Sequence, residues 1–566
     1  MSQRTAQAFL DLVHLPHHDR VKRIPGAGLT GFFTDEPSFS AANYHAGNLS
    51  PWFPAMPFSL DLPDAFHKHH GSDWRPDLPL LYYEAGPRSL QFRCRHWQTC
   101  SRLYAENYFG QIFRFCDERG LAASGNLLGD ENLMAHLALQ AGNVLAAYRN
   151  MHVPAIDWNN PFQKPLHPLV PRFAASMAHL KGRPRTLCKS FAASGWGLTL
   201  QQAGRIVHWQ HVNGLNMQVP TSFKYSLRAP GRARFDNPGI SYQQPYWDHF
   251  RAFADYEARL CLLTAGLGHV AQIALAYPAV ELWANCWEHG LLSIRSHDYF
   301  LLADLLRQAG YDFDVLDDDA IQQETRVADG SLATPTEKFQ VLVLPPAEAV
   351  SRPTLERAIE LARDGGAVLL VGRLPRHSLE AGADDPEVLR LTRELLGPTC
   401  YEKVKEEKTF WNPLGKGRAG FAPVVEEAPA MIRQVLTPDF SLPPDTYGFF
   451  AFHRRLDDAD LYLVLNRATS PRSTTFTLAA RGRPEKWDPR TGRAEPVHDY
   501  EITPDGTRVT LDFAADELVP IVLRPPAQNQ LKGTHKTRET LKEIPLPGPF
   551  RFCVEQTMSR PDVSWN

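Results

Sequence analysis

The chain has 566 residues, of which 43% are hydrophobic, and its 60 lysines and arginines nearly balance its 63 aspartates and glutamates. A formal net charge of -3 leaves no strongly basic surface for a phosphate backbone, which argues against nucleic acid as a partner. A chain of this length is too long for a single hydrophobic core, so we expect about three or four domains.

No segment predicts secretion or a membrane anchor. Residues 1–15 lack the apolar run of a signal peptide, and no stretch reaches the roughly 18 to 20 apolar residues that span a bilayer. The eight cysteines form no C-x-x-C pair, which indicates buried thiols rather than disulfides. We therefore expect a cytoplasmic protein without a membrane partner.

The first half of the chain alternates short apolar runs with amphipathic stretches, a pattern typical of β/α units. Gly120 and Gly182 follow helix-like stretches and suit left-handed helix ends. Five strands are expected, at residues 29–33, 121–124, 153–156, 186–191 and 212–219. We interpret residues 1–268 as a partial (β/α)8-type (TIM) barrel within an α/β protein.

The second half changes its pattern twice. Apolar strands at residues 270–276, 339–344 and 367–372, separated by helix-like stretches at 299–310 and 353–363, indicate a doubly wound sheet. In residues 445–525, apolar and polar residues alternate instead, which predicts the strands of a β-sandwich.

These patterns define three further segments. They are a glutamine amidotransferase-like (flavodoxin-like) α/β domain at 269–400, a small β-sandwich at 401–527, and a linker with the start of a further, truncated β domain at 528–566. No cysteine lies between Cys286 and Cys400, so the α/β domain lacks an amidotransferase nucleophile. We expect it to be structural or oligomeric, which leaves a homo-oligomer open.

Carboxylates follow two of the predicted barrel strands. Asp35 and Glu36 end the first strand, and Glu131 follows the second. Barrel active sites lie at the carboxyl ends of the strands, and two carboxyl groups, one protonated and one ionised, suit cleavage of a glycosidic bond. In an inverting pair, the carboxyls of Glu36 and Glu131 would lie about 6.5 to 9.5 Å apart. The alternative is that each carboxylate caps a helix in a solvated turn.

Aromatic and amide side chains gather at the ends of the later predicted strands. An aromatic face covers the C–H patch of a sugar, while amides and carboxylates bind its hydroxyls. A single tryptophan is more often a core residue, so the hypothesis depends on the grouping. The candidate sugar contacts are Asp35, Asp157, Trp158, Trp196, His211, Asn213 and Asn216.

Taken in order, these motifs resemble glycoside hydrolase family 106, the α-L-rhamnosidases, from about residue 9 to residue 276. The resemblance is carried by the motifs at residues 32–37, 152–158, 191–196, 209–216 and 242–247. It implies hydrolysis of terminal α-L-rhamnose with inversion, with a rhamnose-containing glycan or glycoside as the partner. Glu36 would be the general acid, and Glu131 the base or a sugar contact. The resemblance also allows a calcium ion (Ca2+), which oxygen ligands would suit.

Two departures from the family carry predictions. Only about 28 residues precede the first strand, too few for three β/α units, so we expect a barrel that lacks its early strands and exposes a strand edge. In addition, Lys189 stands where the family has a glutamate before Ser190 and Phe191. A cation there cannot act as a base and would hold Glu36 ionised.

We therefore include Lys189 among the catalytic positions and expect it to face the site and to leave little or no activity. Three alternatives stay open: Lys189 turns outward and activity is intact, the chain is a catalytically impaired carbohydrate-binding homologue, or its α/β domain serves assembly only.

Other chemistries have weaker signals. The histidine runs at residues 17–18 and 67–70 have no partners at ligand spacing, so no metal site is predicted. The chain has neither a G-x-S-x-G elbow nor a phosphate-binding P-loop.

Overall fold

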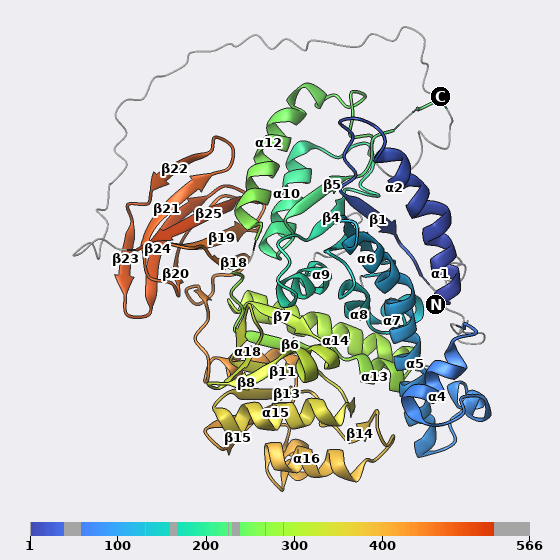
Figure 1. Ribbon diagram of the computed structural model, residues 1–566. Coiled ribbons are helices and arrows are strands. Elements are labelled where there is room, and N and C mark those ends of the chain that lie inside the picture. Colours follow the sequence, from blue (N-terminus) through green and yellow to red (C-terminus); the bar gives the residue numbers. More distant parts are fainter. Residues whose placement is uncertain are drawn as a thin grey trace, which may run out of the picture.

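The computed structural model describes residues 2–38, 58–130, 132–158, 167–224, 226–228, 238–266, 268–286 and 288–525. Figure 1 shows a helix-covered parallel sheet, an α/β sheet beside it and a β-sandwich. Residues 528–566, predicted to be a linker and the start of another domain, lie outside the described residues. In the part of the chain that is described, no helix has the length and apolar character needed to cross a membrane.

The first sheet is a parallel half-barrel. Its strands pair in chain order, and the first four confirm the predicted ones within a few residues. They are β1 (Gly31–Asp35), β2 (Ala122–Asn126), β3 (Val153–Trp158), β4 (Leu187–Ser190) and β5 (Met217–Pro220). The fifth prediction, residues 212–219, is wrong at its start because α10 (Leu200–Val212) continues to Val212. A capping box between Thr199 and Gln202 begins this helix.

Helices surround this sheet along the chain. Helix α9 packs against both β3 and β7 (Phe313–Leu316), and every residue of α9 except His179 is buried. The helices are α1 (Gln3–Phe9), α2 (Leu15–Val21), α4 (Leu62–His70), α5 (Pro87–Tyr104), α6 (Gly110–Asp117), α7 (Leu133–Gln140), α8 (Val144–Tyr148), α9 (Leu169–Leu180) and α12 (Trp247–Thr264).

The second sheet is mixed. Its parallel strands lie in the order β7-β6-β11-β13-β16, which is the flavodoxin-like order, and β15 pairs antiparallel to β16. The strands are β6 (Ile273–Ala276), β7 (Phe313–Leu316), β11 (Val341–Leu344), β13 (Ala367–Val371), β15 (Phe410–Leu414) and β16 (Gly417–Ala422). The sheet therefore extends beyond residue 400, the predicted end of this domain.

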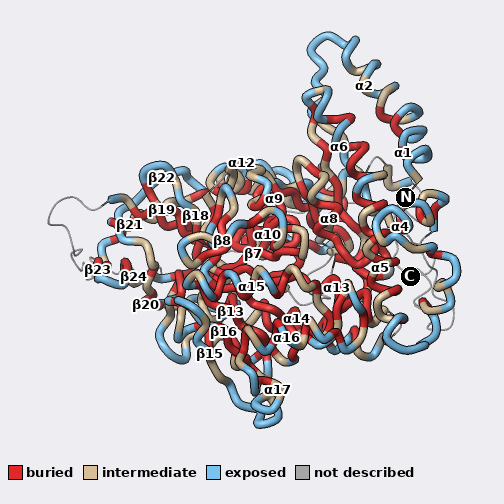
Figure 2. Tube along the Cα trace, turned by 60° about the horizontal axis from the view of Figure 1, so that its bottom comes forward, coloured by how far each residue is buried: buried red, intermediate tan, exposed pale blue. Residues whose placement is uncertain are grey.

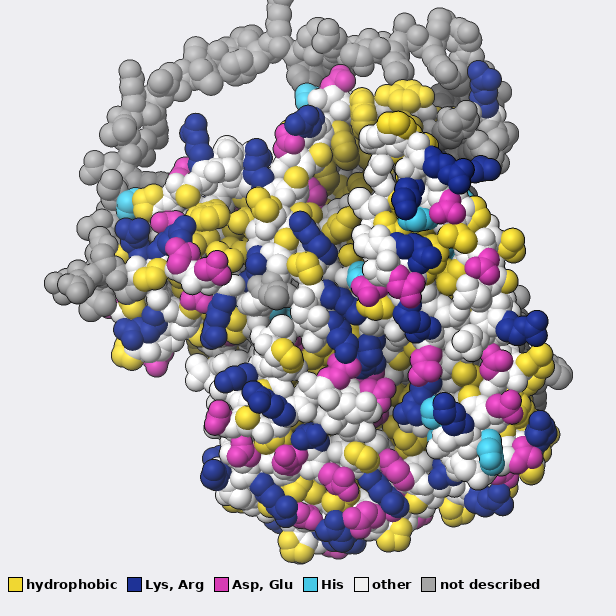
Figure 3. All heavy atoms as spheres, viewed as in Figure 1, with side chains coloured by type: hydrophobic (Ala, Val, Ile, Leu, Met, Phe, Trp, Pro, Cys, Tyr) yellow, Lys and Arg dark blue, Asp and Glu magenta, His cyan; other side chains and the backbone are white. Residues whose placement is uncertain are grey.

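The helices of this domain are α13 (Ala279–Ala284), α14 (His289–Gln308), α15 (Arg352–Asp364), α16 (Pro386–Leu396), α17 (Cys400–Lys403) and α18 (Ala428–Ile432). Short strands join its loops, namely β8 (Arg326–Ala328), β9 (Ser331–Ala333), β10 (Lys338–Phe339), β12 (Ala349–Val350) and β14 (His377–Ser378). On the face shown in Figure 3, acidic and basic side chains are interspersed over this domain, with no single-sign patch there.

The third part is an antiparallel sandwich with a core of its own that includes Phe449, Phe476, Val509 and Ile521. One sheet holds β17 (Phe440–Ser441), β20 (Arg472–Leu478), β24 (Gly506–Phe513) and β23 (Tyr500–Thr503). The other holds β18 (Phe449–Arg455), β19 (Asp460–Asn466), β25 (Leu518–Arg524), β21 (Arg483–Asp488) and β22 (Arg493–Pro496).

The three parts share packing surfaces. Helix α9 packs on β7, and α10 packs on β18 and β19. Figure 2 shows buried residues continuing from the half-barrel into the α/β sheet, and one apolar cluster includes residues of all three parts. The α/β domain and the sandwich therefore both pack against helices of the half-barrel.

The β1–β2 pairing depends on Gly125, which lies opposite Thr34. A Cβ at this position would meet the Thr34 side chain and lie 2.6 Å from its carbonyl oxygen. We expect Gly125→Ala to lower the free energy of unfolding by about 1 to 3 kcal/mol, measured by urea denaturation. Gly28→Ala is the matched control, because nothing lies within 4 Å of a Cβ there. Equal midpoints for the two variants would contradict this account of the pairing.

Candidate functional site

Four charged side chains meet at the carboxyl ends of β1, β3 and β4. Nζ of Lys189 lies 2.8 Å from Oδ1 of Asp35, 2.6 Å from Oδ2 of Asp157 and 3.7 Å from Oε1 of Glu36. Asp157 and Lys189 are register partners in β3 and β4. We call Asp35, Glu36, Asp157 and Lys189 the carboxylate cluster. Its amine lies between carboxylates from two strands.

The cluster is open on one side. The Asp35 side chain is 62% exposed, whereas that of Asp157 is 6% exposed. Lys189 and Glu36 are intermediate. A ligand arriving from solvent would therefore meet Asp35 and Glu36 first and Asp157 last.

The backbone around the cluster takes uncommon conformations. Glu36 has φ 50°, and its N–H donates to the carbonyl oxygen of Asn126. Phe191 and Ala193, directly after β4, also have positive φ. Such residues gather at functional sites, where the surrounding structure holds them. The sequence offered no signal for them, because none of the three is glycine.

The charges in the cluster influence one another. Burial raises the pKa of Asp157 to about 7, although Lys189 acts to lower it, and the adjacent Glu36 carboxyl adds to the rise. Burial alone would lower the pKa of Lys189, but the carboxylates of Asp157 and Asp35 outweigh it and hold that pKa above its usual value. Near neutral pH, Lys189 is therefore charged, while Asp157 takes up or releases a proton.

Two tryptophans and Glu131 were also predicted to belong to this site. The Trp196 ring packs against Gly239, where an added Cβ would collide with it, and its indole nitrogen has no partner among the described residues. Trp158 is the last residue of β3, but its side chain is not described. Glu131 lies outside the described residues. The predicted distance between its carboxyl and that of Glu36 therefore stays a prediction.

His211 does not lie with the cluster. It is fully buried on α10, where its Nε2 lies 2.9 Å from Oε1 of Glu257 and its Nδ1 lies 3.2 Å from the Thr264 hydroxyl, both on α12. Its partners are therefore those of a residue that packs two helices together, and its side chain is shielded from solvent.

Asn213 and Asn216 also lie apart from the cluster. Asn213 is buried and donates to the Trp209 carbonyl. Oδ1 of Asn216 accepts from the N–H of Thr186, which precedes β4, so Asn216 lies at the opposite end of the sheet from Lys189. The structure therefore places both asparagines apart from the carboxylate cluster, and their role as sugar contacts stays a prediction. The expected strand at residues 212–219 begins later than predicted, because α10 reaches Val212 and β5 begins at Met217.

The calcium ion allowed by the family resemblance does not fit the carboxylate cluster. The ammonium group of Lys189 already lies between the oxygens that would bind such an ion, at 2.6 and 2.8 Å. A divalent cation would have to displace this charge. We assign no step to calcium.

Solved structures of known proteins share the fold of this chain. The fold is similar to that of a rhamnosidase from Novosphingobium sp. PP1Y, with a TM-score of 0.67 at 22% identity, over 86% of this chain and 44% of that chain. It is also similar to a beta-galactosidase from Bacillus circulans sp. alkalophilus, with a TM-score of 0.61 at 11% identity, over 90% of this chain and 81% of that one. The chain, with its parallel half-barrel, is thus similar in fold to barrel-type glycoside hydrolases.

The sequence then gives the family. The profile of glycoside hydrolase family 106, described as alpha-L-rhamnosidase, matches residues 53–502, so the chain belongs to this family. Over 482 residues the chain is 23% identical to a Formosa agariphila protein provisionally named a beta-glucuronidase. The matched region covers 83% of this chain and 37% of that protein. The chain spans less than half the length of that protein and of the rhamnosidase.

The coupling between Lys189 and Asp157 predicts a pH effect. Asp157 holds its proton more tightly in the folded chain than in the unfolded chain, where a carboxyl pKa is about 3.9. Its contribution to the free energy of unfolding therefore falls as the pH rises from about 4 to the folded pKa, and then levels off. In the native chain this fall ends near pH 7, from the pKa of about 7. In Lys189→Met the fall in the free energy of unfolding should continue to higher pH, because Lys189 lowers the pKa of Asp157 in the native chain.

Urea midpoints measured from pH 5 to pH 9, a range of about two units on either side of neutrality, would test this effect. Lys181→Met is the matched control, since Lys181 pairs with Glu324 away from the cluster. Profiles of the same shape for both variants would contradict the coupling.

Proposed function

We propose that the carboxylate cluster binds the terminal α-L-rhamnosyl residue of a glycan or glycoside, and that the chain is a glycoside hydrolase whose turnover Lys189 limits. The observation that carries this proposal is the meeting of Asp35, Glu36 and Asp157 at the carboxyl ends of two barrel strands. Membership of family 106 supports the choice of sugar. Carboxylates in this position can accept hydrogen bonds from sugar hydroxyls.

Asp157 can supply a proton. A pKa of about 7 leaves this carboxyl partly protonated at neutral pH, as a general acid requires. The Glu36 carboxyl lies near enough to raise the pKa of Asp157, whereas the two carboxyls of an inverting pair stand about 6.5 to 9.5 Å apart with a water between them. The base must therefore come from elsewhere, and Glu131 stays the candidate.

Lys189 favours a second candidate, a sugar-binding homologue with little turnover. Its ammonium group pairs with Asp35 and Asp157, so it cannot take a proton from water. It would also repel the positive charge that develops on the sugar ring in the transition state. Binding of hydroxyl groups is not opposed in this way.

Turnover of an aryl α-L-rhamnoside separates these candidates. We expect weak activity in the native chain and an increase in kcat/KM of about 10- to 100-fold in Lys189→Glu, because a carboxylate returns to the position that the family uses. Glu36→Gln and Asp157→Asn in the Lys189→Glu background should abolish the gain. Lys181→Glu is the matched control and should leave turnover unchanged.

The contrary outcomes are distinct. Strong native activity that Glu36→Gln abolishes and Lys189→Glu does not raise would show that Lys189 is not limiting. If calorimetry detects no binding of L-rhamnose and no variant turns over the rhamnoside, the proposed sugar itself is wrong.

A further inference from the structure

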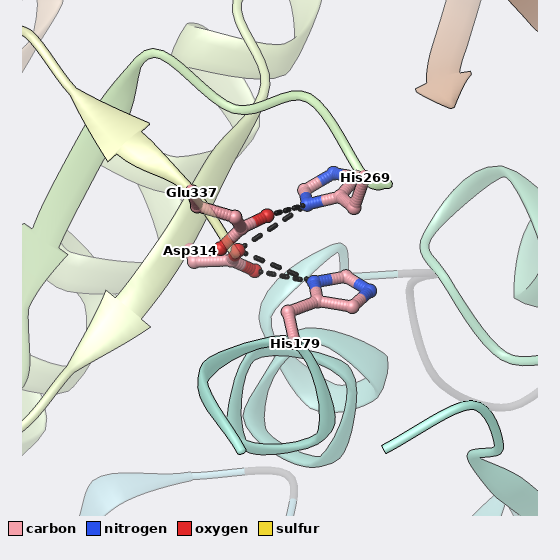
Figure 4. A group of neighbouring side chains, drawn as sticks. All are labelled: His179, His269, Asp314 and Glu337. Atoms are coloured by element: carbon pink, nitrogen blue, oxygen red, sulfur yellow. Dashed lines mark hydrogen bonds and ion pairs between the residues drawn. The ribbon is translucent and has the colours of Figure 1, made fainter. Parts of the chain in front are cut away.

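A second cluster lies away from the proposed site, at the junction between the half-barrel and the α/β domain. Figure 4 shows His179 of α9, His269 between α12 and β6, Asp314 of β7 and Glu337 before β10 turned toward one another. Their ligand atoms all lie within 4.8 Å of one another. We call these four side chains the junction cluster.

Nitrogen and carboxylate oxygen atoms face each other within the cluster. Nδ1 of His179 lies 3.0 Å from Oδ1 of Asp314. Nδ1 of His269 lies 2.7 Å from Oε1 of Glu337 and 3.2 Å from Oδ2 of Asp314. Both imidazoles thus turn the same type of nitrogen toward the two carboxylates.

The cluster has more acceptors than donors. The side chains of Asp314 and Glu337 are 0% and 2% exposed. Oε2 of Glu337 has no hydrogen-bond partner among the described residues, and Figure 4 shows it directed toward Asp314. Two adjacent buried carboxylates need a cation or a proton between them.

The other ring nitrogen of His269, which faces away from Glu337 and Asp314, also has a carboxylate partner. Nε2 of His269 lies 3.3 Å from Oδ2 of Asp312, and this carboxylate is held by Arg172 at 2.7 Å and Arg307 at 2.9 Å. A carboxylate that accepts the proton of one ring nitrogen leaves the lone pair of the other available. This arrangement is usual for histidines that bind metals.

We propose that the junction cluster binds one first-row divalent metal ion of the zinc type. Two imidazoles and two carboxylates form the nitrogen and oxygen set that such ions accept. Ligands at 2.0 to 2.2 Å from a tetrahedral ion lie roughly 3.4 Å apart, so small rotations of these side chains would admit it. Because four protein ligands close the site, the ion would be structural and would join α9 to the α/β domain.

The alternative to a metal ion is that protons on the imidazole nitrogens bond the two carboxylates. Nη1 of Arg172 lies 3.2 Å from Nε2 of His269. If that nitrogen accepts from Arg172, Nδ1 of His269 carries the proton and bonds the carboxylates without a metal. The two alternatives differ in metal content and in the response to added zinc.

The test uses the full chain after treatment with a chelator. Zn2+ is added, unbound metal is removed, and the metal content and melting temperature are measured. We expect about one bound equivalent and a rise in melting temperature. Glu337→Gln and His179→Gln should weaken zinc binding about 10- to 100-fold. His211→Gln is the control, because His211, Glu257 and Cys261 form another group that could hold an ion.

Cobalt provides a readout that needs no substitution. Co2+ in the native chain should give a spectrum without a thiolate charge-transfer band, since the junction cluster has no cysteine, whereas the His211 group contains Cys261. The proposal is overturned if the chain binds no stoichiometric zinc, if zinc leaves the melting temperature unchanged, or if the thiolate band dominates. It is also overturned if folded Glu337→Gln binds zinc as tightly as the native chain.

Discussion

The parallel pairing of β1 to β5 is the constraint on which the candidate site depends. In a parallel sheet all carboxyl ends lie at one edge, and the register places Asp35 opposite Asn126 and Asp157 opposite Lys189. Charged side chains more than 150 positions apart in the chain therefore meet within hydrogen-bonding distance, as Lys189 and Asp35 do. The close approach of β1 and β2 at Gly125 supports this arrangement.

The rest of the chain holds this sheet through a buried polar junction as well as through apolar packing. Arg172 of α9 reaches Asp312 at the start of β7, and Arg149 reaches Asp317 at 2.7 Å. Buried charges of this kind are costly unless they are fully paired, so they fix one relative placement of the half-barrel and the α/β domain. The position of β3 and β4 thus depends on residues far from the site.

The sequence predicted those parts of the site that depend on local pattern. Asp35, Glu36 and Lys189 follow or lie within strands that apolar runs and flanking turns identify, and the structure brings these three residues together. His211 and Asn216 were misplaced because an apolar run interrupted by polar residues suits a helix end as well as a strand. The junction cluster could not be predicted, since its ligands at positions 179, 269, 314 and 337 share no spacing and meet only through packing between domains.

The Lys189 amine acts as a counterion that the protein supplies for itself. Lys189 pairs with Asp35 and Asp157. Its positive charge therefore weakens the negative electrostatic field that the carboxylates of the cluster present to an arriving molecule. Ions of the solvent have correspondingly less charge to screen. The proposed binding of a neutral sugar at the carboxyl ends of these strands should therefore be nearly independent of ionic strength, and ligand shape and hydroxyl arrangement, rather than long-range attraction, would decide what binds.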